Sequence, residues 1–299
     1  MRVTDSGMSL NYLASINQAR EQIMDLQGQV ASGKRVQKPS DDPVAIGSIM
    51  RLQTSLDQNA QYSQNISAGK GIIDATTGAL DSLSDLLTTL KQTVTSAVNA
   101  STTEALSTDA DTVDQLLGEA VDIANTRFGG KYIFGGTQTL DSPFTLSADH
   151  STITMNPNGI DGTISLPVGD GVQEQVNIPG EQAFGGTALF DLMIQIRDTM
   201  NSGSSPTAAQ VDAVNQSLDQ ILNSAGKAGS ISQSLDTFSA NLDQQKTQLT
   251  AMLSNVQDAD IAEASMKLQN YQVMLNAALA VAAQSLPKSL LDFLGSTAL

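Results

Sequence analysis

The 299-residue sequence has no cysteine and no tryptophan, a single histidine, and only 4% aromatic residues. The absence of cysteine excludes disulfides and thiolate chemistry, and it leaves the redox compartment open. Aromatic side chains supply much of the interior of many globular domains. A chain with 40% hydrophobic residues but so few aromatic ones therefore favours slender helical layers.

Basic residues and long apolar runs are also scarce. Lys and Arg number 15 against 31 Asp and Glu, a formal charge of -16 that repels nucleic acid and anionic membranes, so neither is an expected partner. The most apolar stretch, 275–283, is far shorter than the roughly 20 residues that span a bilayer. Residues 1–26 are interrupted by charged side chains and do not form a secretory signal. If the chain leaves the cell, we expect a route other than a cleaved signal.

Heptad-like apolar spacing occurs at both ends of the sequence. Alternating steps of four and three residues place one apolar stripe on a predicted N-terminal helix: Tyr12, Ile16, Ala19, Ile23, Leu26, Val30 and Gly33. The segment 38–43, KPSDDP, ends this helix; Ser40 or Asp41 is expected to cap the next one, with Pro43 in its first turn. Two further apolar frames, 231–256 and 261–282, are separated by a five-residue step that should disturb a supercoil locally.

The middle of the sequence changes character twice. Long helices are predicted from about 43 to 97 and from about 103 to 127, the latter ended by Gly129-Gly130. The apolar stripe of the first comprises Ile46, Ile49, Leu52, Leu56, Ile66, Ile73, Leu80, Leu83, Leu87, Leu90, Val94 and Ala97, and that of the second comprises Leu106, Val113, Leu117, Ala120 and Ala124. Residues 131–186 contain short β-branched runs and turns such as Asn158-Gly159 and Asp161-Gly162, which predict a small β-rich insertion. Helical patterns return at 187–201 and 207–225.

The predicted fold is mainly α with a small β-rich insertion. Its parts are terminal assembly helices (1–40 and 260–299), a helical core (41–130 and 187–259) and a β-rich outer domain (131–186). Apolar stripes of this length aggregate if exposed, so the N- and C-terminal segments are expected to form a long antiparallel coiled coil or bundle. They would pair within the chain, with neighbouring copies, or both.

Motifs that could carry chemistry are weak. Residues 28–35, GQVASGKR, come within one residue of a phosphate-binding loop, but they end a helical run instead of following a strand. His150 has no local signature of a catalytic triad and is interpreted as a loop histidine. The pairs Asp109/Asp111 and Asp258/Asp260 lack the glycine and terminal glutamate of a calcium loop, so helix starts are the expected role. We predict no enzymatic activity, no cofactor and no metal site.

A basic cluster, Lys34, Arg35 and Lys38, stands out in the acidic sequence. It could dock onto acidic faces of neighbouring copies. It could equally be a solvated turn whose cations are favourably placed at a helix C-terminus. The sequence leaves both interpretations open.

Residues 26–43, LQGQVASGKRVQKPSDDP, closely resemble the N-terminal signature of the bacterial flagellin family. Residues 258–264, DADIAEA, with Leu268, Tyr271 and Leu275, resemble the C-terminal helix of that family. Within the family, the opening MRVT, residues 125–136, NTRFGGKYIFGG, and residues 290–294, LLDFL, are most similar to hook-filament junction subunits. Pro287 after Ala283-Gln284-Ser285 is closer to the tail of the filament subunit, flagellin itself.

The resemblance implies an inner core of N- and C-terminal helices and an outward β-containing domain. It also implies a structural protein of the extracellular flagellum, exported unfolded through a type III apparatus. The implied partners are hook-associated protein 1, flagellin, copies of the chain itself in a ring, and a cytoplasmic export chaperone on the C-terminal helix. The residues expected at the assembly interface are Ile16, Ile23, Leu26, Val30, Lys34, Arg35, Asp41, Asp42, Ile261, Leu268, Tyr271 and Leu275.

Two further hypotheses follow from the sequence. The terminal stripes, about 1–40 and 260–299, are expected to be poorly ordered in the free monomer, because an isolated helix gains too little to offset roughly 1–2 kcal/mol of backbone entropy per residue. A role from another class is a surface adhesin or binding module acting through residues 137–186.

Overall fold

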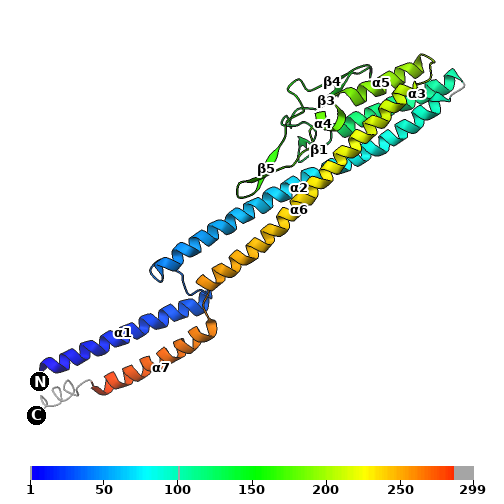
Figure 1. Ribbon diagram of the computed structural model, residues 1–299. Helices are drawn as coiled ribbons and strands as arrows, with labels where there is room; N and C mark the ends of the chain where they lie inside the picture. The colour runs from blue at the N-terminus through cyan, green and yellow to red at the C-terminus, as the bar shows by residue number, and fades with distance from the viewer. Residues whose placement is uncertain (1, 100–101, 286–299) are drawn as a thin grey trace, which may run out of the picture. The chain divides into compact units, whose positions relative to one another are not determined.

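A computed structural model describes residues 2–99 and 102–285 of the chain (Figure 1). These residues are mostly helical, with three small antiparallel hairpins, which confirms the predicted fold class. The helices are α1 (Arg2–Ser32), α2 (Pro43–Val98), α3 (Thr103–Ala124), α4 (Gly180–Phe184), α5 (Ala188–Asn201), α6 (Ala208–Gln257) and α7 (Ile261–Ser285). The strands are β1 (Arg127–Phe128), β2 (Lys131–Tyr132), β3 (Phe144–Leu146), β4 (Ile153–Met155), β5 (Ser165–Gly169) and β6 (Val172–Gln175).

The chain divides into two compact units. Unit 1 comprises residues 1–57 and 246–299, and unit 2 comprises residues 58–245. The long helices α2 and α6 contribute to both units. The sequence-based division into terminal assembly helices, helical core and outer domain concerns roles in assembly, and it stays a prediction.

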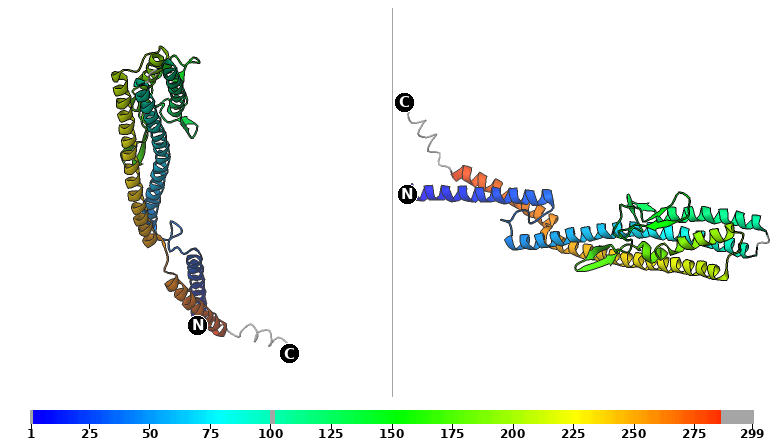
Figure 2. Two further views of the ribbon diagram at one scale, coloured as in Figure 1. Left: turned by 90° about the vertical axis from the view of Figure 1, so that its right-hand side faces the viewer. Right: turned by 90° about the horizontal axis from the view of Figure 1, so that it is seen from above.

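In unit 2, α2 and α6 run antiparallel side by side (Figures 1 and 2). Asn59, which is 4% exposed, joins them through its Nδ2, which donates to the carbonyl oxygen of Leu242 at 3.0 Å. The predicted apolar stripe of α2 is buried in this unit: Ile66, Ile73, Leu80, Leu83, Leu87, Leu90, Val94 and Ala97. The helical patterns at 207–225 and 231–256 belong to one helix, α6, because Gly226 and Gly229 between them do not take a left-handed backbone and no proline separates them.

Helix α3 packs on α5 and buries the predicted face, which includes Leu106, Val113 and Leu117. Thr102 caps α3 by accepting a hydrogen bond from the backbone N–H of Ala105 at 3.2 Å. The helix ends at Ala124, three residues before the predicted end at about 127, so Gly129-Gly130 does not end it. These glycines, with φ of 58° and 81°, instead form the turn between β1 and β2, because their left-handed backbone suits a tight hairpin.

The three hairpins pair antiparallel as β1 with β2, β3 with β4, and β5 with β6. Asp170-Gly171 lies between β5 and β6, with Gly171 at φ 68°. Asn158-Gly159 also forms a turn, but it connects β4 to β5, which do not pair, and Asp161-Gly162 forms no turn. The prediction that Asn158-Gly159 is a turn between strands is therefore confirmed, and the prediction for Asp161-Gly162 is wrong. A turn signal does not specify whether the strands it joins pair with each other.

The few aromatic residues are concentrated where the hairpins meet the helices. Four of the seven phenylalanines pack in one cluster: Phe134, Phe144, Phe184 and Phe190. The ring centroids of Phe134 and Phe184, and those of Phe144 and Phe190, are each 4.8 Å apart. All four side chains are at most 3% exposed. The β-rich insertion is thus attached to the helical core by a compact aromatic contact.

Candidate assembly surface

The helices α1 and α7 lie side by side in unit 1 (Figures 1 and 2). The predicted interface residues on their facing sides are partly or fully covered: Ile16 and Leu26 are each 7% exposed, and Ile23, Val30, Leu268, Tyr271 and Leu275 are half-buried. Ala264, which is 5% exposed, completes this inner face. The N- and C-terminal stripes therefore pair within one chain.

Further apolar side chains of the same two helices are open to solvent. On α1 they are Leu10, Leu13 and Met24, which are 57–67% exposed. On α7 they are Ile261, Met266, Val273, Met274, Leu279 and Val281, which are 41–62% exposed. We call these residues the outer apolar face. A helix with apolar residues on more than one side is normally buried on each of those sides. A single pair of α1 and α7 therefore leaves apolar area of both helices uncovered.

Most of the outer apolar face was missed by the sequence analysis. The heptad search assigned one stripe to each helix, and Met24, Met266 and Met274 lie between the positions of that stripe. The signal that would have revealed them is the number of apolar residues at positions of α1 and α7 outside the heptad stripe. Ile261, by contrast, was predicted at the interface and lies on the exposed side, at 47%.

The turn that follows α1 is fixed to the end of α6. Lys34 forms an isolated antiparallel bridge with Asp258, and the backbone N–H of Arg35 donates to Gln257 O at 2.7 Å. The guanidinium of Arg35 donates to Val256 O at 2.9 Å. Val36 is 1% exposed and packs with Ala45, Ile49 and the partly buried Ile46, Leu253 and Val256. The loop 33–42 is therefore a small folded platform, and we call it the basic turn.

Two carboxylates hold the basic turn and start α2. Asp41 Oδ2 accepts hydrogen bonds from the backbone N–H groups of Lys38 and Gln37, at 2.9 and 3.0 Å, which lower the pKa of Asp41. Asp42 Oδ1 accepts from the N–H groups of Ala45 and Val44, at 2.9 and 3.2 Å, and the bond from Ala45 lowers its pKa most. Asp42 is thus the cap of α2, and the expected capping by Ser40 or Asp41 is wrong because these residues lie further back in the turn. Pro43 is the first residue of α2, as predicted.

The break between α6 and α7 falls at the predicted five-residue step. Asp260 Oδ1 accepts from the N–H groups of Ala262 and Glu263 at 2.9 and 3.0 Å, so it caps α7 as expected for a helix start. Asp109 and Asp111 lie in the interior of α3, and their predicted place at a helix start is wrong. Thr102 and Glu104 occupy that start instead.

The cations of the basic turn differ in their partners. Nη1 of Arg35 lies 3.6 Å from Oδ2 of Asp42, which makes an ion pair. Lys34 and Lys38 are exposed, and neither forms an ion pair with any of the residues that the structure describes. They follow the C-terminus of α1, where positive charge is favourable. Both interpretations of the cluster, a docking patch and a solvated turn, stay predictions.

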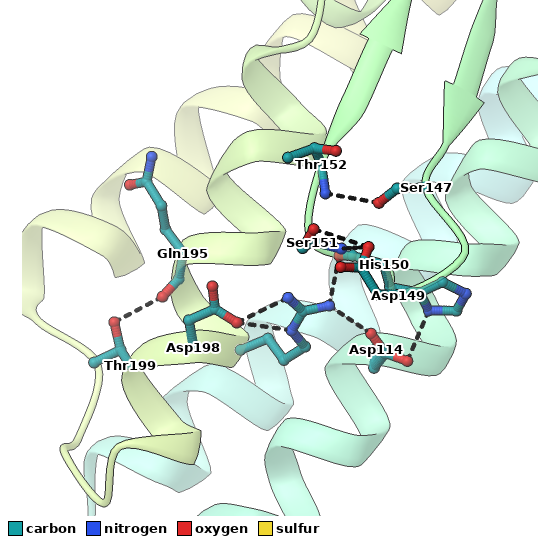
Figure 3. Close-up of polar contacts among 10 residues, drawn as sticks. Asp114, Ser147, Asp149, His150, Ser151, Thr152, Gln195, Asp198 and Thr199 are labelled. Carbon is teal, nitrogen blue, oxygen red and sulfur yellow. Dashed lines mark hydrogen bonds and ion pairs between the residues drawn. The ribbon is translucent and has the colours of Figure 1, made fainter.

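His150 lies in a polar network of unit 2 (Figure 3). Its Nδ1 is 2.9 Å from Asp114 Oδ2, and its backbone oxygen accepts from Arg197 Nη1 at 2.7 Å. Arg197, whose side chain is 10% exposed, also bonds Asp114 at 2.7 Å and Asp198 at 2.8 Å. Burial opposes ionisation of Asp114, but the hydrogen bonds from Arg197 and His150 outweigh it and hold the pKa of Asp114 below its usual range. The network fastens the loop between β3 and β4 to α3 and α5.

The remaining motifs that could have carried a chemical function lie in ordinary structural elements. Residues 28–35 end α1 and enter the basic turn, and within the described residues no strand precedes them, so they lack the context of a phosphate-binding loop. In the described part of the chain, no three His, Asp or Glu side chains gather where they could hold a metal ion. Among the described helices, none has the length and apolar content to cross a membrane.

Two family models match the chain. The model of the bacterial flagellin N-terminal helical region matches residues 3–139, and that of the bacterial flagellin C-terminal helical region matches residues 211–294. The flagellin of Bacillus subtilis is 24% identical over 287 residues, which cover 93% of this chain and 92% of that protein. Flagellar hook-associated protein 3 of Salmonella typhimurium is 29% identical over 150 residues, 48% of this chain and 46% of that protein.

Solved structures share the fold. A flagellar hook-associated protein of Vibrio parahaemolyticus has a TM-score of 0.66 at 20% identity, covering 73% of this chain and all of that one. FlgL of Bacillus cereus has a TM-score of 0.58 at 24% identity, covering 68% of this chain and 99% of that one. The regions that the two family models match include nearly all of α1 and α7, the paired helices of unit 1, and of the long helices α2 and α6. The chain belongs to the bacterial flagellin family.

Proposed function

We propose that this protein is a structural subunit of the bacterial flagellum, and that it serves as the hook-filament junction protein, hook-associated protein 3. The observation that carries the structural role is the outer apolar face of α1 and α7. A subunit that exposes Leu10, Met24, Met266 and Val273 to more than half of their full area needs neighbours to cover them. Covering apolar area stabilises an assembly by about 25 cal/mol per Å².

The assignment to the junction is supported by relatives and by residues 125–136. Flagellar hook-associated protein 3 of Escherichia coli, like that of Salmonella typhimurium, matches about half of the chain, at 28% identity. The stretch 125–136 contains the β1–β2 hairpin, and its Asn125, Ile133 and Phe134 connect the hairpin to the core of unit 2. A junction subunit would contact hook-associated protein 1 on one side and flagellin on the other, with copies of itself around a ring.

The proposed mechanism is folding coupled to assembly. The inner face of α1 and α7 is only partly covered within one chain, so the interface residues Ile23, Val30, Tyr271 and Leu275 have area left for neighbours. The terminal segments would complete their order when those neighbours bury both faces. Before export, the same apolar residues of α7 would be covered by a cytoplasmic chaperone, and the extracellular flagellum is the proposed location.

A truncation tests the assembly role. Removal of residues 261–299 deletes α7 and uncovers the inner face of α1, while it leaves every residue of unit 2 in place. We expect the truncated protein to retain the urea unfolding transition of unit 2 and to be absent from flagella purified from a strain that expresses it. Normal incorporation of the truncated protein would contradict the proposal.

A filament subunit is the alternative within the same class, favoured by the match to Bacillus subtilis flagellin over nearly the whole chain. Deletion of the gene separates the two roles. A strain without a junction subunit secretes unpolymerised flagellin, whereas a strain without flagellin ends at a capped hook. Labelled protein gives an independent answer, since a spot at the base of each filament indicates the junction and label along its length indicates flagellin.

An adhesin or binding module remains the proposal from another class, and it would act through residues 137–186. Much of this segment is tied to the core of unit 2, because Phe144, Ile160, Val168 and Val176 are each at most 1% exposed. Leu140→Ser/Val172→Ser changes two exposed side chains of this segment and leaves its buried ones in place, so the variant should still incorporate if the role is structural. Surface binding that is lost while incorporation persists would support the adhesin.

A further inference from the structure

Unit 2 contains an acidic groove between its two long helices. It is lined by Asp74, Gly78 and Asp81 of α2 and by Gly229, Ser232 and Asp236 of α6. Neither Gly78 nor Gly229 has an atom within 4 Å of the position that a Cβ would take, so an incoming side chain has room between the helices. We call this surface the acidic groove.

The charge of the acidic groove is only partly neutralised within the chain. Lys70 pairs with Asp236, and both side chains are largely exposed. Asp74 and Asp81 are exposed, and neither forms an ion pair with a residue in the described ranges. They lie two helical turns apart on one face of α2, about 10 Å along the axis. Lys70 also interacts electrostatically with Asp74, so the three carboxylates of the groove share this cation and keep a net negative charge.

The basic turn of unit 1 offers the complementary charge on a rigid support. Lys34 and Lys38 are exposed, and the backbone between them is held by Asp41 and by the bonds to Gln257 and Val256. A turn that is already ordered loses little conformational entropy on binding. The turn is also small and carries the fully buried Val36, which keeps its backbone from rearranging.

We propose that the acidic groove of one copy binds the basic turn of a second copy of this chain. This inference rests on the proposed function as an assembly subunit, and it names one contact between the subunits. Charge is the reason for the choice of partner: unit 2 contains six basic and 21 acidic residues, whereas unit 1 contains nine basic and ten. A contact between two different surfaces of identical chains is heterologous, and such contacts build rings or helical arrays. The contact orients neighbours, while the apolar faces supply most of the stability.

Disulfide trapping tests the contact directly, because the full-length chain has no cysteine of its own. One copy carries Ser40→Cys in the basic turn, and the other carries Ser232→Cys in the acidic groove. The control partner carries Gln216→Cys, at an exposed position of α6 outside the groove. At low salt we expect about fivefold more cross-linked pairs with Ser232→Cys than with the control, the size that two exposed ion pairs would give. The excess should fall as salt shortens the Debye length below about 10 Å.

Charge reversal supplies the second arm. Lys34→Glu/Lys38→Glu in the first copy should reduce cross-linking to the control level, and Asp74→Lys/Asp81→Lys in the second copy should restore it. Asp111→Lys/Glu119→Lys on α3 changes the net charge equally and should restore nothing. Equal yields with both cysteine partners, or equal rescue by both reversals, would overturn the proposal.

The outcomes separate this contact from the proposed function. If labelled wild-type protein is found in flagella while the cross-linking excess is missing, the contact is wrong and the structural role stands. If the wild-type protein is absent from flagella, the structural role fails whatever the purified chains do. Urea unfolding of each reversal variant shows whether it keeps the fold, and a variant with an unchanged transition but lost cross-linking supports the contact.

Discussion

Unit 2 and unit 1 place their apolar side chains differently. Unit 2 encloses its large side chains, and those of Ile73, Leu80, Leu83, Leu117 and Phe190 are completely buried. In unit 1, Ile16 and Leu26 keep 7% of their area exposed, while Leu10 and Met24 expose more than half. A unit of the first kind can obtain its stability from its own core, whereas one of the second kind gains further stability when other chains cover it.

The two units also differ in charge. The sequence assigns a formal charge of -15 to unit 2 and of -1 to unit 1, from 6 basic and 21 acidic residues against 9 and 10. Strong charge of one sign keeps identical surfaces apart, and near-neutral apolar surfaces can pack closely. The difference favours contacts between copies in which at least one surface belongs to unit 1, and it disfavours contacts of unit 2 with unit 2. Substitutions in the core of unit 2 and on the apolar surface of unit 1 should therefore have different effects on stability and on assembly.

The largest effect is expected in the aromatic cluster of unit 2. Phe190→Ala removes a completely buried ring that contacts Phe144 and Phe184, with centroids 4.8 and 5.8 Å away. It should lower the free energy of unfolding of unit 2 by about 3–5 kcal/mol, since the cavity would be lined by rigid neighbours. Urea denaturation followed by circular dichroism measures this loss.

The matched control is Leu140→Ala, which removes a side chain that is 76% exposed in the same β-containing region. We expect the control to change the unfolding free energy by less than about 0.5 kcal/mol. A similar loss in both variants would mean that the core of unit 2 does not dominate its stability.

A smaller loss is expected when Arg197 is replaced. Arg197→Met keeps the apolar stem and removes the guanidinium that bonds Asp114, Asp198 and the backbone of His150. Unit 2 should lose about 2 kcal/mol, because the His150 carbonyl and the Asp114 carboxylate each lose a charged donor. Lys70→Met breaks an exposed pair and serves as the control, for which no measurable change is expected.

Acid provides a second measurement on this variant. The folded pKa of Asp114 lies below its ordinary value of 3.8, so its stabilising contribution is complete above pH 3.8 and is lost as pH falls through the folded pKa. Removal of Arg197 brings the folded pKa closer to the ordinary value. The difference in stability between wild type and Arg197→Met should therefore narrow as pH falls below 3.8, and a constant difference would exclude this pairing as its cause.

A third variant tests helix capping in unit 2. Thr102→Ala removes the hydroxyl that accepts from the N–H of Ala105, and it should cost about 1 kcal/mol. Thr108→Ala, on the exposed side of the same helix, removes a hydroxyl that bonds the Glu104 carbonyl and should change stability less. Equal losses would show that the first turn of α3 does not depend on its cap.

Periodicity predicted the helices well because it reports which side chains share a face. The stripe from Ile66 to Ala97 was predicted on α2, and it lies in the core of unit 2. A local disturbance before Ile261 was also predicted, since a five-residue step cannot continue a heptad frame, and the structure has a break between α6 and α7 there. Local patterns did not predict which groups meet across the chain, such as Asp114 with Arg197, or Lys34 with Asp258.

Turn chemistry was less reliable than periodicity. The segment KPSDDP has three possible capping residues, and the choice of Asp42 depends on the path that Val36 imposes when it is buried against Ala45 and Ile49. The apolar surface of α1 and α7 was described only in part for a similar reason. A single stripe per helix identifies Ile16 and Leu26, which are buried within the chain, but it omits Met24 and Met274, which are exposed in the single chain.

The smallest effect on monomer stability, and the sharpest test of the contrast, comes from the outer apolar face. Met24→Gln and Met274→Gln keep side-chain length and helix propensity, and both positions are about 60% exposed. The unfolding free energy of the monomer should change by less than about 0.5 kcal/mol. Incorporation into flagella should nevertheless fall sharply, because each neighbour would have to bury an amide in place of a thioether. Quantitative immunoblots of purified flagella measure the loss.

The matched variant on the inner face should behave in the opposite order. Leu26→Gln places an amide against α7 within the same chain, so it should weaken the pairing of α1 with α7 in the monomer before any partner is present. Hydrogen exchange of α1 amides distinguishes the two cases: faster exchange for Leu26→Gln, and unchanged exchange for Met24→Gln. If both variants speed exchange equally, the two faces are not distinct and the outer one is not reserved for neighbours. If Met24→Gln leaves exchange and incorporation both unchanged, the exposed methionines contribute nothing to assembly, and the comparison between the units reduces to a difference in core size.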